Sequence, residues 1–211
     1  MPMQLEIAAS PQTGPLAFAI RAERPSDKPF RERLLDAAMG PARKRKSSEK
    51  LRRGRLPAEG MAFVATLPDG TVAGTVRLWH VGAGNGPDGS PVPALLLGPL
   101  ACDVSLKGLG IGTALMQTAM AAAARSGCGA VLLVGDHAYY ARFGFRQGLT
   151  DLLAMPGPYE RERFLAAEIV PGHLAEAQGV LTAAGGRSHG RLEDASRLAR
   201  IGQPHLRQGN P

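Results

Sequence analysis

The chain has 211 residues, of which 44% are hydrophobic and 20% charged, so it has enough apolar residues for a core and is not a globally disordered chain. No stretch has the continuous apolar length of a membrane span, the N-terminus lacks the pattern of a signal peptide, and the two cysteines suggest no disulfide framework, so we expect a cytoplasmic protein without a membrane partner. The net charge of +7 favours an anionic partner, but charge alone does not identify its kind.

The N-terminal part of the chain predicts a strand followed by a helix. Apolar and polar residues alternate through residues 16–24, which is typical of a strand, and Pro25 ends it. Ser26 or Asp27 is a suitable cap for a helix that ends at the Gly-Pro pair of residues 40–41. We expect one face of this helix to be buried, and its members are Phe30, Leu34, Leu35 and Ala38.

A strongly basic segment comes next, and we expect it to form a second, less regular helix that ends near Gly54. Between residues 43 and 55, eight basic residues face a single acid, Glu49. A charge run of this kind is typically a solvated surface, and it holds no aromatic residue for stacking on single-stranded bases. Nucleic acid is therefore a partner that we do not favour, although this surface keeps it open as an alternative.

The middle of the chain predicts an antiparallel hairpin and a further strand. Residues 61–67 and 71–81 form the strands of the hairpin, and a Pro-Asp-Gly turn joins them. Residues 82–91 are rich in glycine, and we expect a loop there. Residues 93–104 are apolar on both faces and predict a fourth strand, in which Gly98-Pro99 interrupts the pairing as a bulge.

The second half of the chain predicts a crossover from strand to helix to strand. Residues 111–125 predict a helix that Gly127 ends, and the wholly apolar residues 130–134 predict a strand buried on both sides of a parallel pair. Asp136 is a suitable cap for a brief helix over residues 137–143. The inward face of the longer helix consists of Leu115, Ala119, Ala122 and Ala123.

The C-terminal part predicts closing strands and then a tail. Strands are expected from Phe145 onward and over residues 163–170, and from Ala184 the composition indicates a mobile tail. Taken together, the predicted elements form an α+β domain on one mixed sheet.

The glycine-rich stretch SLKGLGIGTAL, residues 105–115, lies between a predicted strand and a predicted helix. The first amides of a helix have no partner within the helix, and the aligned peptide dipoles give that end a partial positive charge. Glycine leaves such amides open to an anion because it has no side chain. The combination of strand, glycine loop and helix therefore predicts a pyrophosphate site.

Two other kinds of phosphate-binding loop do not fit this stretch. A nucleotide-hydrolysing loop requires the pattern GxxxxGK[ST], which the sequence lacks. A dinucleotide-binding loop requires GxGxxG, but the third glycine is replaced by Thr113 or Leu115, depending on the starting glycine. Asp136 would suit the ribose in such a fold, but a β-meander precedes the loop where that fold has a βαβ unit. We therefore interpret Asp136 as a helix cap.

Three segments, in order along the chain, resemble motifs of the GNAT acetyltransferase superfamily. GPLACD, residues 98–103, resembles part of its fourth strand, and KGLGIG, residues 107–112, resembles its Q/R-x-x-G-x-G/A signature, with Lys107 where the family has Gln or Arg. YYARFGF, residues 139–145, resembles its F-Y-x-x-x-G-F box. The sequences of the three segments are similar to those of a subgroup of largely uncharacterised bacterial members, and the resemblance covers roughly residues 16–175.

The resemblance implies a fold, a cosubstrate and a binding site. It implies a GNAT-like domain over residues 1–175, with a mixed, mostly antiparallel sheet splayed between its fourth and fifth strands and flanked by helices, and a partly mobile extension over residues 176–211. It implies acetyl-CoA as acyl donor, with pantetheine between the splayed strands and pyrophosphate on the glycine loop. The implied binding residues are Leu100, Ala101, Cys102, Lys107, Gly108, Leu109, Gly110, Ile111, Gly112 and Thr113. No metal is expected, because the five histidines and two cysteines show no ligand spacing.

The implied reaction is direct transfer of the acetyl group to a primary amine. The resemblance implies that Tyr140 protonates the departing thiolate, with Tyr139 as the alternative. A base or a water chain should take the proton of the amine. His80, Asp103 and Glu59 are weak candidates for that base, and the sequence identifies none.

We favour an acyltransferase whose acceptor is a small-molecule or protein amine. The resemblance implies an acceptor pocket formed by the basic segment and residues 82–91, and its cationic wall favours an acidic acceptor or carrier. The first alternative is a non-catalytic acyl-CoA-binding or regulatory module that keeps the cradle without turnover. The second is a basic nucleic-acid-associated protein, and a homodimer is compatible with the sequence in each case.

Overall fold

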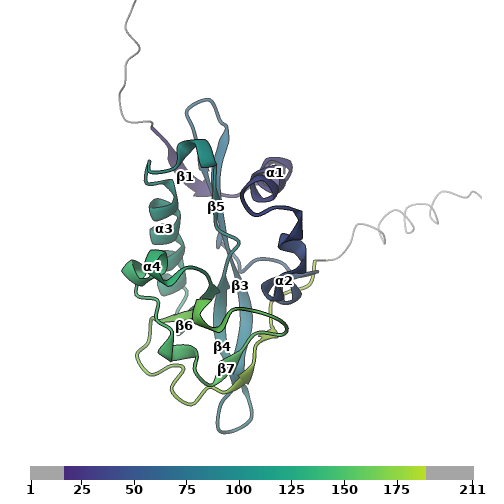
Figure 1. The fold of residues 1–211 in the computed structure, drawn as a ribbon, viewed down its shortest axis with the longest axis vertical. Coiled ribbons are helices and arrows are strands. Elements are labelled where there is room, and N and C mark those ends of the chain that lie inside the picture. The colour runs from purple at the N-terminus through teal and green to yellow at the C-terminus, as the bar shows by residue number, and fades with distance from the viewer. Residues whose placement is uncertain (1–16, 189–211) are drawn as a thin grey trace, which may run out of the picture.

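The computed structural model describes residues 17–188, and its sheet is built around one long strand, β3 (Val72–Asn85) (Figure 1). The strand order is β1 (Ala19–Ala22), β2 (Ala62–Thr66), β3, β4 (Pro91–Leu97), β6 (Ala130–Val134) and β8 (Phe164–Glu168), and the short strands β5 (Ala101–Cys102) and β10 (Thr182–Ala183) also pair with β3. The β4–β6 pair is parallel, whereas the other pairs of this sheet are antiparallel. The predicted α+β fold on a mixed, mostly antiparallel sheet is confirmed.

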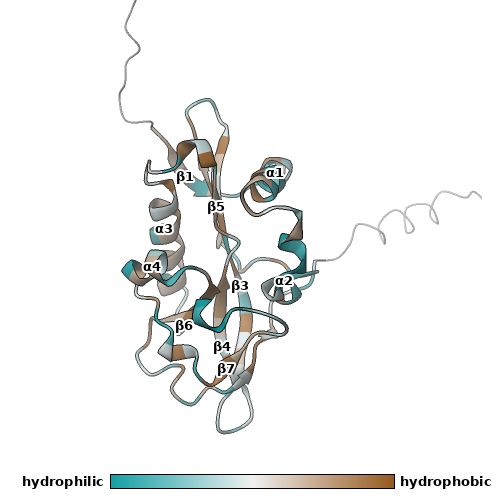
Figure 2. Ribbon diagram, viewed as in Figure 1, coloured by the Kyte–Doolittle hydropathy of each residue, from teal (hydrophilic) through white to brown (hydrophobic). Residues whose placement is uncertain are grey.

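Helices cover both faces of the sheet. The helices α3 (Ile111–Arg125) and α4 (His137–Tyr140) lie on one face, and α1 (Lys28–Met39) and α2 (Ser47–Arg52) lie on the other (Figure 1). Figure 2 shows that α2 carries mostly hydrophilic residues, as the basic segment predicts. A separate pair of parallel strands, β7 (Leu153–Ala154) and β9 (Gly179–Val180), completes the described elements.

The packing of α3 on β3 positions the glycine loop. The predicted bounds of this helix are confirmed, and its predicted inward residues are all buried: Leu115, Ala119, Ala122 and Ala123. At Gly74 of β3, a Cβ atom would lie 2.8 Å from Leu115 Cδ1 and 2.9 Å from Ile111 Cγ2. Only glycine lets the first turn of α3 approach the strand this closely, so the start of the helix is held against the sheet.

The buried face of α1 differs from the prediction. Leu34 and Leu35 are buried as expected, but Phe30 is 50% exposed and Ala38 is exposed. In the first turns of α1 the buried residue is Arg31, and its guanidinium forms an ion pair with the buried carboxylate of Glu23. The buried face of α1 therefore includes a charged residue that is paired with another segment. The spacing of apolar residues along the helix does not predict such a pair.

The loop predicted over residues 82–91 is shorter than expected. β3 continues to Asn85 and β4 begins at Pro91, so only residues 86–90 connect them. The extra strand residues gain partners late in the chain, because Gly82 pairs with Thr182 and Asn85 bridges to Gln178. The prediction of a loop over residues 82–85 was wrong because the β3–β4 hairpin extends to Asn85 and Pro91, and the late segment adds a long-range pairing.

The interruption at Gly98-Pro99 is wider than the predicted bulge. The peptide bond between the two residues is cis, and the chain leaves β3 after Leu97 and pairs with it again as β5. The indole nitrogen of Trp79 donates a hydrogen bond to the Gly98 carbonyl at 2.6 Å. One predicted strand is therefore two short strands that pair with the same neighbour.

The last described part of the chain packs on the sheet. The strand predicted over residues 163–170 is confirmed as β8, whereas the chain from Phe145 forms only a single bridge, between Arg146 and Ala166. In the segment expected to be an extension, Ala177 and Leu181 are buried and β10 pairs with β3. The tail predicted from Ala184 lies, from residue 189 on, outside the described residues.

Candidate active site

The glycine loop ends in a group of amides without hydrogen-bond partners. The first bond of α3 runs from the Ala114 amide to the Gly110 carbonyl at 2.9 Å. Within residues 17–188, five amides before it donate to no acceptor, those of Gly108, Gly110, Ile111, Gly112 and Thr113. Five open amides at the positive end of a helix dipole form a site for an anion.

The three glycines of the loop have two different roles. Gly108 and Gly110 have φ angles of 90° and 82°, which residues other than glycine rarely adopt. A Cβ atom on either residue would point into open space. At Gly112, by contrast, a Cβ atom would lie 2.8 Å from the hydroxyl oxygen of Tyr139. The first two glycines therefore shape the loop, and the third makes room for a tyrosine.

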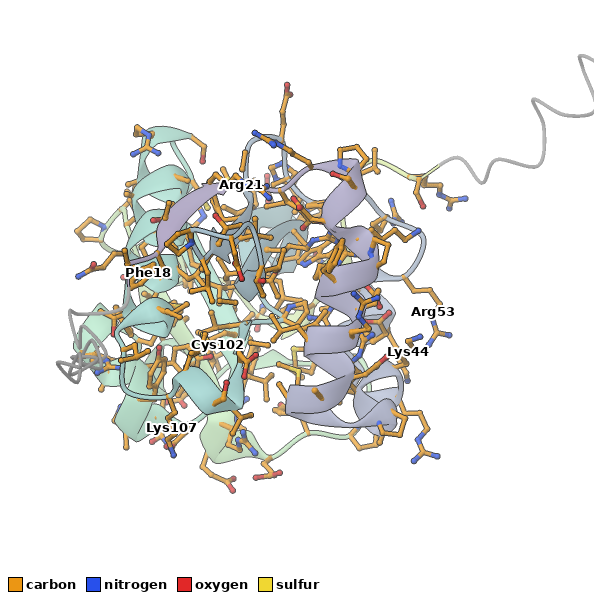
Figure 3. All side chains as sticks on the ribbon, turned by 90° about the horizontal axis from the view of Figure 1, so that it is seen from above. Phe18, Arg21, Lys44, Arg53, Cys102 and Lys107 are labelled. Atoms are coloured by element: carbon orange, nitrogen blue, oxygen red, sulfur yellow. The ribbon has the colours of Figure 1, made fainter. Side chains whose placement is uncertain are left out.

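A cavity of about 290 Å³ opens onto these amides. Its wall includes Cys102, Lys107, Tyr139 and Arg142, and the Arg142 guanidinium stacks 4.3 Å from the centre of the Tyr139 ring. Figure 3 shows Cys102 and Lys107 on the α3 side of the molecule, whereas Lys44 and Arg53 lie on the side of α1 and α2. Two cations and five amides at one cavity favour a ligand with more than one negative charge.

The sheet opens beside this cavity, between β4 and β6. These strands pair only at Leu95–Val131 and Leu96–Leu132, and beyond that point they diverge. A second cavity of about 80 Å³, here called the splay cavity, lies between residues 97–100 on one side and Leu133 and Val134 on the other. The splay that was predicted between the strands over residues 93–104 and 130–134 is confirmed, and it lies between β4 and β6.

The edge of the opening presents backbone amides to a ligand. The Asp103 amide donates to the Ala73 carbonyl at 2.9 Å, and because strand amides alternate in direction, the Cys102 amide points away from β3. In the described part of the chain, the Leu100 amide has no acceptor. An extended ligand could therefore pair with Leu100 and Cys102 as an added strand does.

Two other residues that the resemblance implied are placed less favourably for a ligand. Ala101 is buried and pairs with Thr75, so its amide faces β3. The Leu109 amide donates to the Leu106 carbonyl at 3.4 Å, and its side chain is 43% exposed. The structure thus brings the other eight implied binding residues to the two cavities or to the edge that connects them.

The two tyrosines of α4 face different cavities. Tyr140 lines the splay cavity and Tyr139 lines the cavity at the glycine loop, with their ring centres 4.9 Å apart in an edge-to-face arrangement. Asp136 positions both, because its carboxylate accepts the Ala138 amide at 3.0 Å and caps the helix as predicted. Burial raises the pKa of Tyr140 to about 12 and also raises the pKa of Tyr139. Both hydroxyls are therefore protonated near neutral pH.

None of the three weak candidates for a base lines the splay cavity. His80 is exposed on β3 and its carbonyl accepts the Ala184 amide at 3.1 Å. Asp103 is occupied with the amide and hydroxyl of Ser105, and Glu59 is exposed. Among residues 17–188, the splay cavity is lined by no carboxylate and no imidazole.

The wall of the splay cavity opposite the tyrosines comes from α1, α2 and the turn between them. It consists of Met39, Arg43, Lys46, Ser48 and Arg52. A cavity of about 200 Å³ adjoins it and shares Lys46, Ser48 and Val134 with it. Residues 86–90 line neither cavity, so only the basic segment forms the wall that the resemblance implied.

Sequence reasoning treated the basic segment as one surface and missed that two of its arginines turn inward. Arg43 is buried and pairs with Asp36 at 2.7 Å and with Glu32 at 2.5 Å. Arg52 reaches Glu49 at 3.1 Å, and its side chain is only 10% exposed. The two acids on one face of α1, four residues apart, are the signal that could have identified the partner of Arg43.

Residues 17–188 bring together no three side chains of His, Cys, Asp or Glu that could hold a metal ion. No helix in the same part of the chain is long and apolar enough to cross a membrane.

Comparison with known proteins gives matches over most of the described chain. The model of the acetyltransferase (GNAT) family matches residues 28–145, and none of the curated proteins matches. The GNAT family N-acetyltransferase YhbS of Escherichia coli, solved in complex with CoA, is 26% identical with a TM-score of 0.67, over 84% of this chain and 93% of that one. A GNAT family acetyltransferase of Brucella melitensis, solved with acetyl-CoA, is 26% identical with a TM-score of 0.58, over 80% and 96% of the two chains. The similarity extends over the whole fold and is not limited to one motif.

Proposed function

Because the chain belongs to the acetyltransferase (GNAT) family, we propose that it transfers an acetyl group from acetyl-CoA directly to the primary amine of an acceptor. The observation that carries this proposal is that the open amides of the glycine loop and the hydroxyl of Tyr140 lie at the two ends of one edge, residues 100–102. A cosubstrate with a pyrophosphate at one end and a thioester at the other fits this arrangement.

The glycine loop holds the pyrophosphate in this proposal. The five open amides of the loop donate to the phosphate oxygens, and Lys107 and Arg142 add positive charge. The pantetheine arm lies along the edge at Leu100 and Cys102, where the Leu100 amide has no acceptor and the Cys102 amide points away from β3. The same amides stabilise the negative charge that develops on the thioester oxygen.

Transfer then proceeds by addition of the acceptor amine to the thioester and loss of the CoA thiolate. The acceptor nitrogen attacks the acetyl carbon and forms the new C–N bond, the C–S bond breaks, and sulfur keeps the electron pair. Before attack, the acceptor ammonium gives one proton to solvent through water. Tyr140 then gives its proton to the sulfur, and the proton that the nitrogen loses after attack reprotonates the tyrosinate through water. CoA leaves as a thiol, and the acceptor leaves as an acetamide.

Burial brings the acidities of donor and leaving group close together. The pKa of Tyr140 is about 12, well above that of a thiol in water. Burial also raises the pKa of the Cys102 thiol to about 11 at the edge of the same opening, which indicates what this environment does to a sulfur. Desolvation acts in the same direction on a CoA thiolate at this opening, which lowers the cost of proton transfer from Tyr140.

The test compares two variants of the tyrosine pair. Tyr140→Phe should lower kcat for thiol release about a hundredfold or more, because general acid catalysis contributes that much, while calorimetry shows acetyl-CoA binding unchanged. Tyr139→Phe tests the alternative acid, and it should lower kcat far less than Tyr140→Phe does if Tyr140 is the donor. Equal rates in Tyr140→Phe and the parent protein would contradict the assigned role, and binding of acetyl-CoA without transfer to any amine would favour the non-catalytic module.

A further inference from the structure

Arg52 is a nearly buried cation with few partners at the splay cavity. Its side chain is 10% exposed and lines the cavity from the face opposite the glycine loop. Within residues 17–188, its Nε atom makes no hydrogen bond, and its one carboxylate partner is Glu49 at 3.1 Å from Nη2. A guanidinium has five N–H donors, and within the described residues the one hydrogen bond to Glu49 leaves most of them without a protein acceptor.

The environment of Arg52 makes its charge unfavourable in the absence of a ligand. Burial lowers the pKa of this guanidinium, Glu49 partly offsets that effect, and repulsion from Arg43 and Arg77 adds to it. An incompletely paired charge in a buried place costs free energy unless an anion completes its hydrogen bonds. The geometry is thus that of a binding group and differs from that of Arg43, which two carboxylates already satisfy.

A second cation reinforces this charge. Lys46 lines both the splay cavity and the adjoining cavity, and it forms no ion pair within the described residues. Where the structure is described, the splay cavity has no carboxylate in its wall, and the adjoining cavity has only Glu160, which lies 3.6 Å from Arg163. The place where the acceptor must present its nitrogen is therefore positively charged.

A positive wall selects among amines. It repels a simple alkylammonium ion, and it lowers the pKa of an ammonium group that is held there by other contacts, which supplies the neutral nitrogen that attack requires. A carboxylate on the same molecule would provide such a contact. This effect also compensates for the absence of a carboxylate or imidazole base from the described wall of the cavity.

Building on the proposed acetyl transfer, we propose that the acceptor is a small amine that also carries a carboxylate, and that Arg52 binds this carboxylate while Lys46 attracts it. The splay cavity of about 80 Å³ is the smaller of the two adjoining cavities and suits the small charged end of the acceptor. A planar carboxylate suits this space and the planar guanidinium. The rest of the acceptor extends into the adjoining cavity of about 200 Å³.

The experiment uses the full chain and has three stages. Calorimetry with acetyl-CoA comes first, followed by a screen of thiol release with L-amino acids, their carboxamides, alkyl diamines, ethanolamine and phosphoethanolamine. For each amino acid that reacts, its N-acetyl derivative and the carboxamide of that derivative are then compared as product inhibitors. Their nitrogens do not titrate, so the comparison isolates the carboxylate.

Three variants test whether Arg52 causes the preference for a carboxylate over a carboxamide. In the parent protein the N-acetyl amino acid should inhibit at least about tenfold more strongly than its carboxamide, as expected for a charge-assisted hydrogen bond. Arg52→Gln should bring this ratio close to one while acetyl-CoA binding is kept, and Arg52→Lys should give an intermediate ratio. Arg45→Gln, which removes the same charge from an exposed residue of the same segment, should keep the ratio of the parent protein.

The outcomes separate this inference from the proposed function. If acetyl-CoA gives no heat, acetyl transfer itself fails. If acetyl-CoA binds and carboxamides, diamines or phosphoethanolamine are the better acceptors, only the carboxylate inference fails. It also fails if Arg45→Gln lowers the ratio as much as Arg52→Gln, because the effect is then one of net charge.

Discussion

The ring of Tyr140 lies directly against the backbone of Gly135. A Cβ atom at Gly135 would be 2.2 Å from Cε2 of the tyrosine and 2.8 Å from Cδ2, far inside van der Waals contact. The other side of the ring meets Tyr139 and Phe145 edge to face, at centre distances of 4.9 Å and 5.9 Å. The glycine after β6 thus forms one wall of the slot that holds the proposed acid.

Gly135→Ala should inactivate the enzyme without unfolding it. The new methyl group has to push Tyr140 out of its slot, because the buried glycine backbone is held by a hydrogen bond from its amide to the Arg163 carbonyl at 2.8 Å. We expect kcat to fall about as far as in Tyr140→Phe, with a loss of stability of about 1–3 kcal/mol from overpacking. Steady-state thiol release and urea unfolding measure the two effects.

The control for this variant is Gly148→Ala. At Gly148 the nearest atom to an added Cβ is 4.0 Å away, so activity and stability should change little. In the double variant Gly135→Ala, Tyr140→Phe, the rate should be close to that of either single variant, because both remove the same group. Multiplied losses in the double variant would mean that Gly135 acts through something other than Tyr140.

Gly112→Ala should weaken acetyl-CoA binding, and removal of one oxygen atom should restore it. The added Cβ would lie 2.8 Å from the Tyr139 hydroxyl but 3.8 Å from Cζ, so the clash is with the hydroxyl alone. We expect the Kd for acetyl-CoA to rise about tenfold, equivalent to about 1.4 kcal/mol, as Tyr139 moves into the cavity. The double variant with Tyr139→Phe should bind within about twofold of Tyr139→Phe alone, as measured by calorimetry. A double variant as weak as Gly112→Ala would show that the methyl group disturbs the helix amides directly.

The elements predicted well from the sequence are those whose causes are local. The apolar period and the glycine after it define α3, a wholly apolar run defines β6, and Asp136 caps α4, all within a few residues of each element. The glycine loop belongs to the same class, because the amides at the start of α3 come from consecutive residues. Such sites are visible in sequence.

The features that escaped prediction depend on residues distant in sequence. Gly82 pairs with Thr182 as well as with Pro93 of β4, and Phe30 is exposed because Arg31 has its partner at Glu23. Similarly, Arg52 lines the splay cavity together with Arg43 and Lys46, and it differs from them in being nearly buried with a single carboxylate partner. Charge partners and strand partners of this kind have no period or spacing from which they could be inferred.

The Asp27 carboxylate should make the fold sensitive to acid. It accepts hydrogen bonds from the Arg21 guanidinium at 2.6 Å and 2.8 Å and from the Arg24 amide at 2.7 Å, and the Arg21 contact holds its pKa down at about 2. Because the pKa is lower in the folded state than in the unfolded state, this contribution is fully present above about pH 4 and is lost as the pH falls toward 2. We expect it to be on the order of 1 kcal/mol.

The measurement for Asp27 is urea unfolding at several pH values between about 2 and 7. Asp27→Asn should be less stable than the parent protein near neutral pH, and the difference should shrink as the pH falls from about 4 to about 2. Asp151→Asn, at an exposed carboxylate, is the control and should follow the parent curve. A difference that stays constant with pH would mean that the Asp27→Asn substitution disturbs packing and not charge.

The raised pKa of Tyr140 determines the alkaline side of the rate profile. A proton donor is active while protonated, and burial keeps Tyr140 protonated up to about pH 12, whereas an ordinary tyrosine is half ionised near pH 10. The value of kcat should therefore rise with pH as the acceptor ammonium loses its proton and then stay level to about pH 10.5, without a descending limb. Phenolate absorbance in the near ultraviolet gives an independent measure, because Tyr140→Phe should leave the absorbance change below about pH 11 unaltered. A descending limb near pH 10 that disappears in Tyr140→Phe would show that this hydroxyl titrates as if it were in water. The proposal that burial brings the pKa values of Tyr140 and the CoA thiol close together would then be wrong.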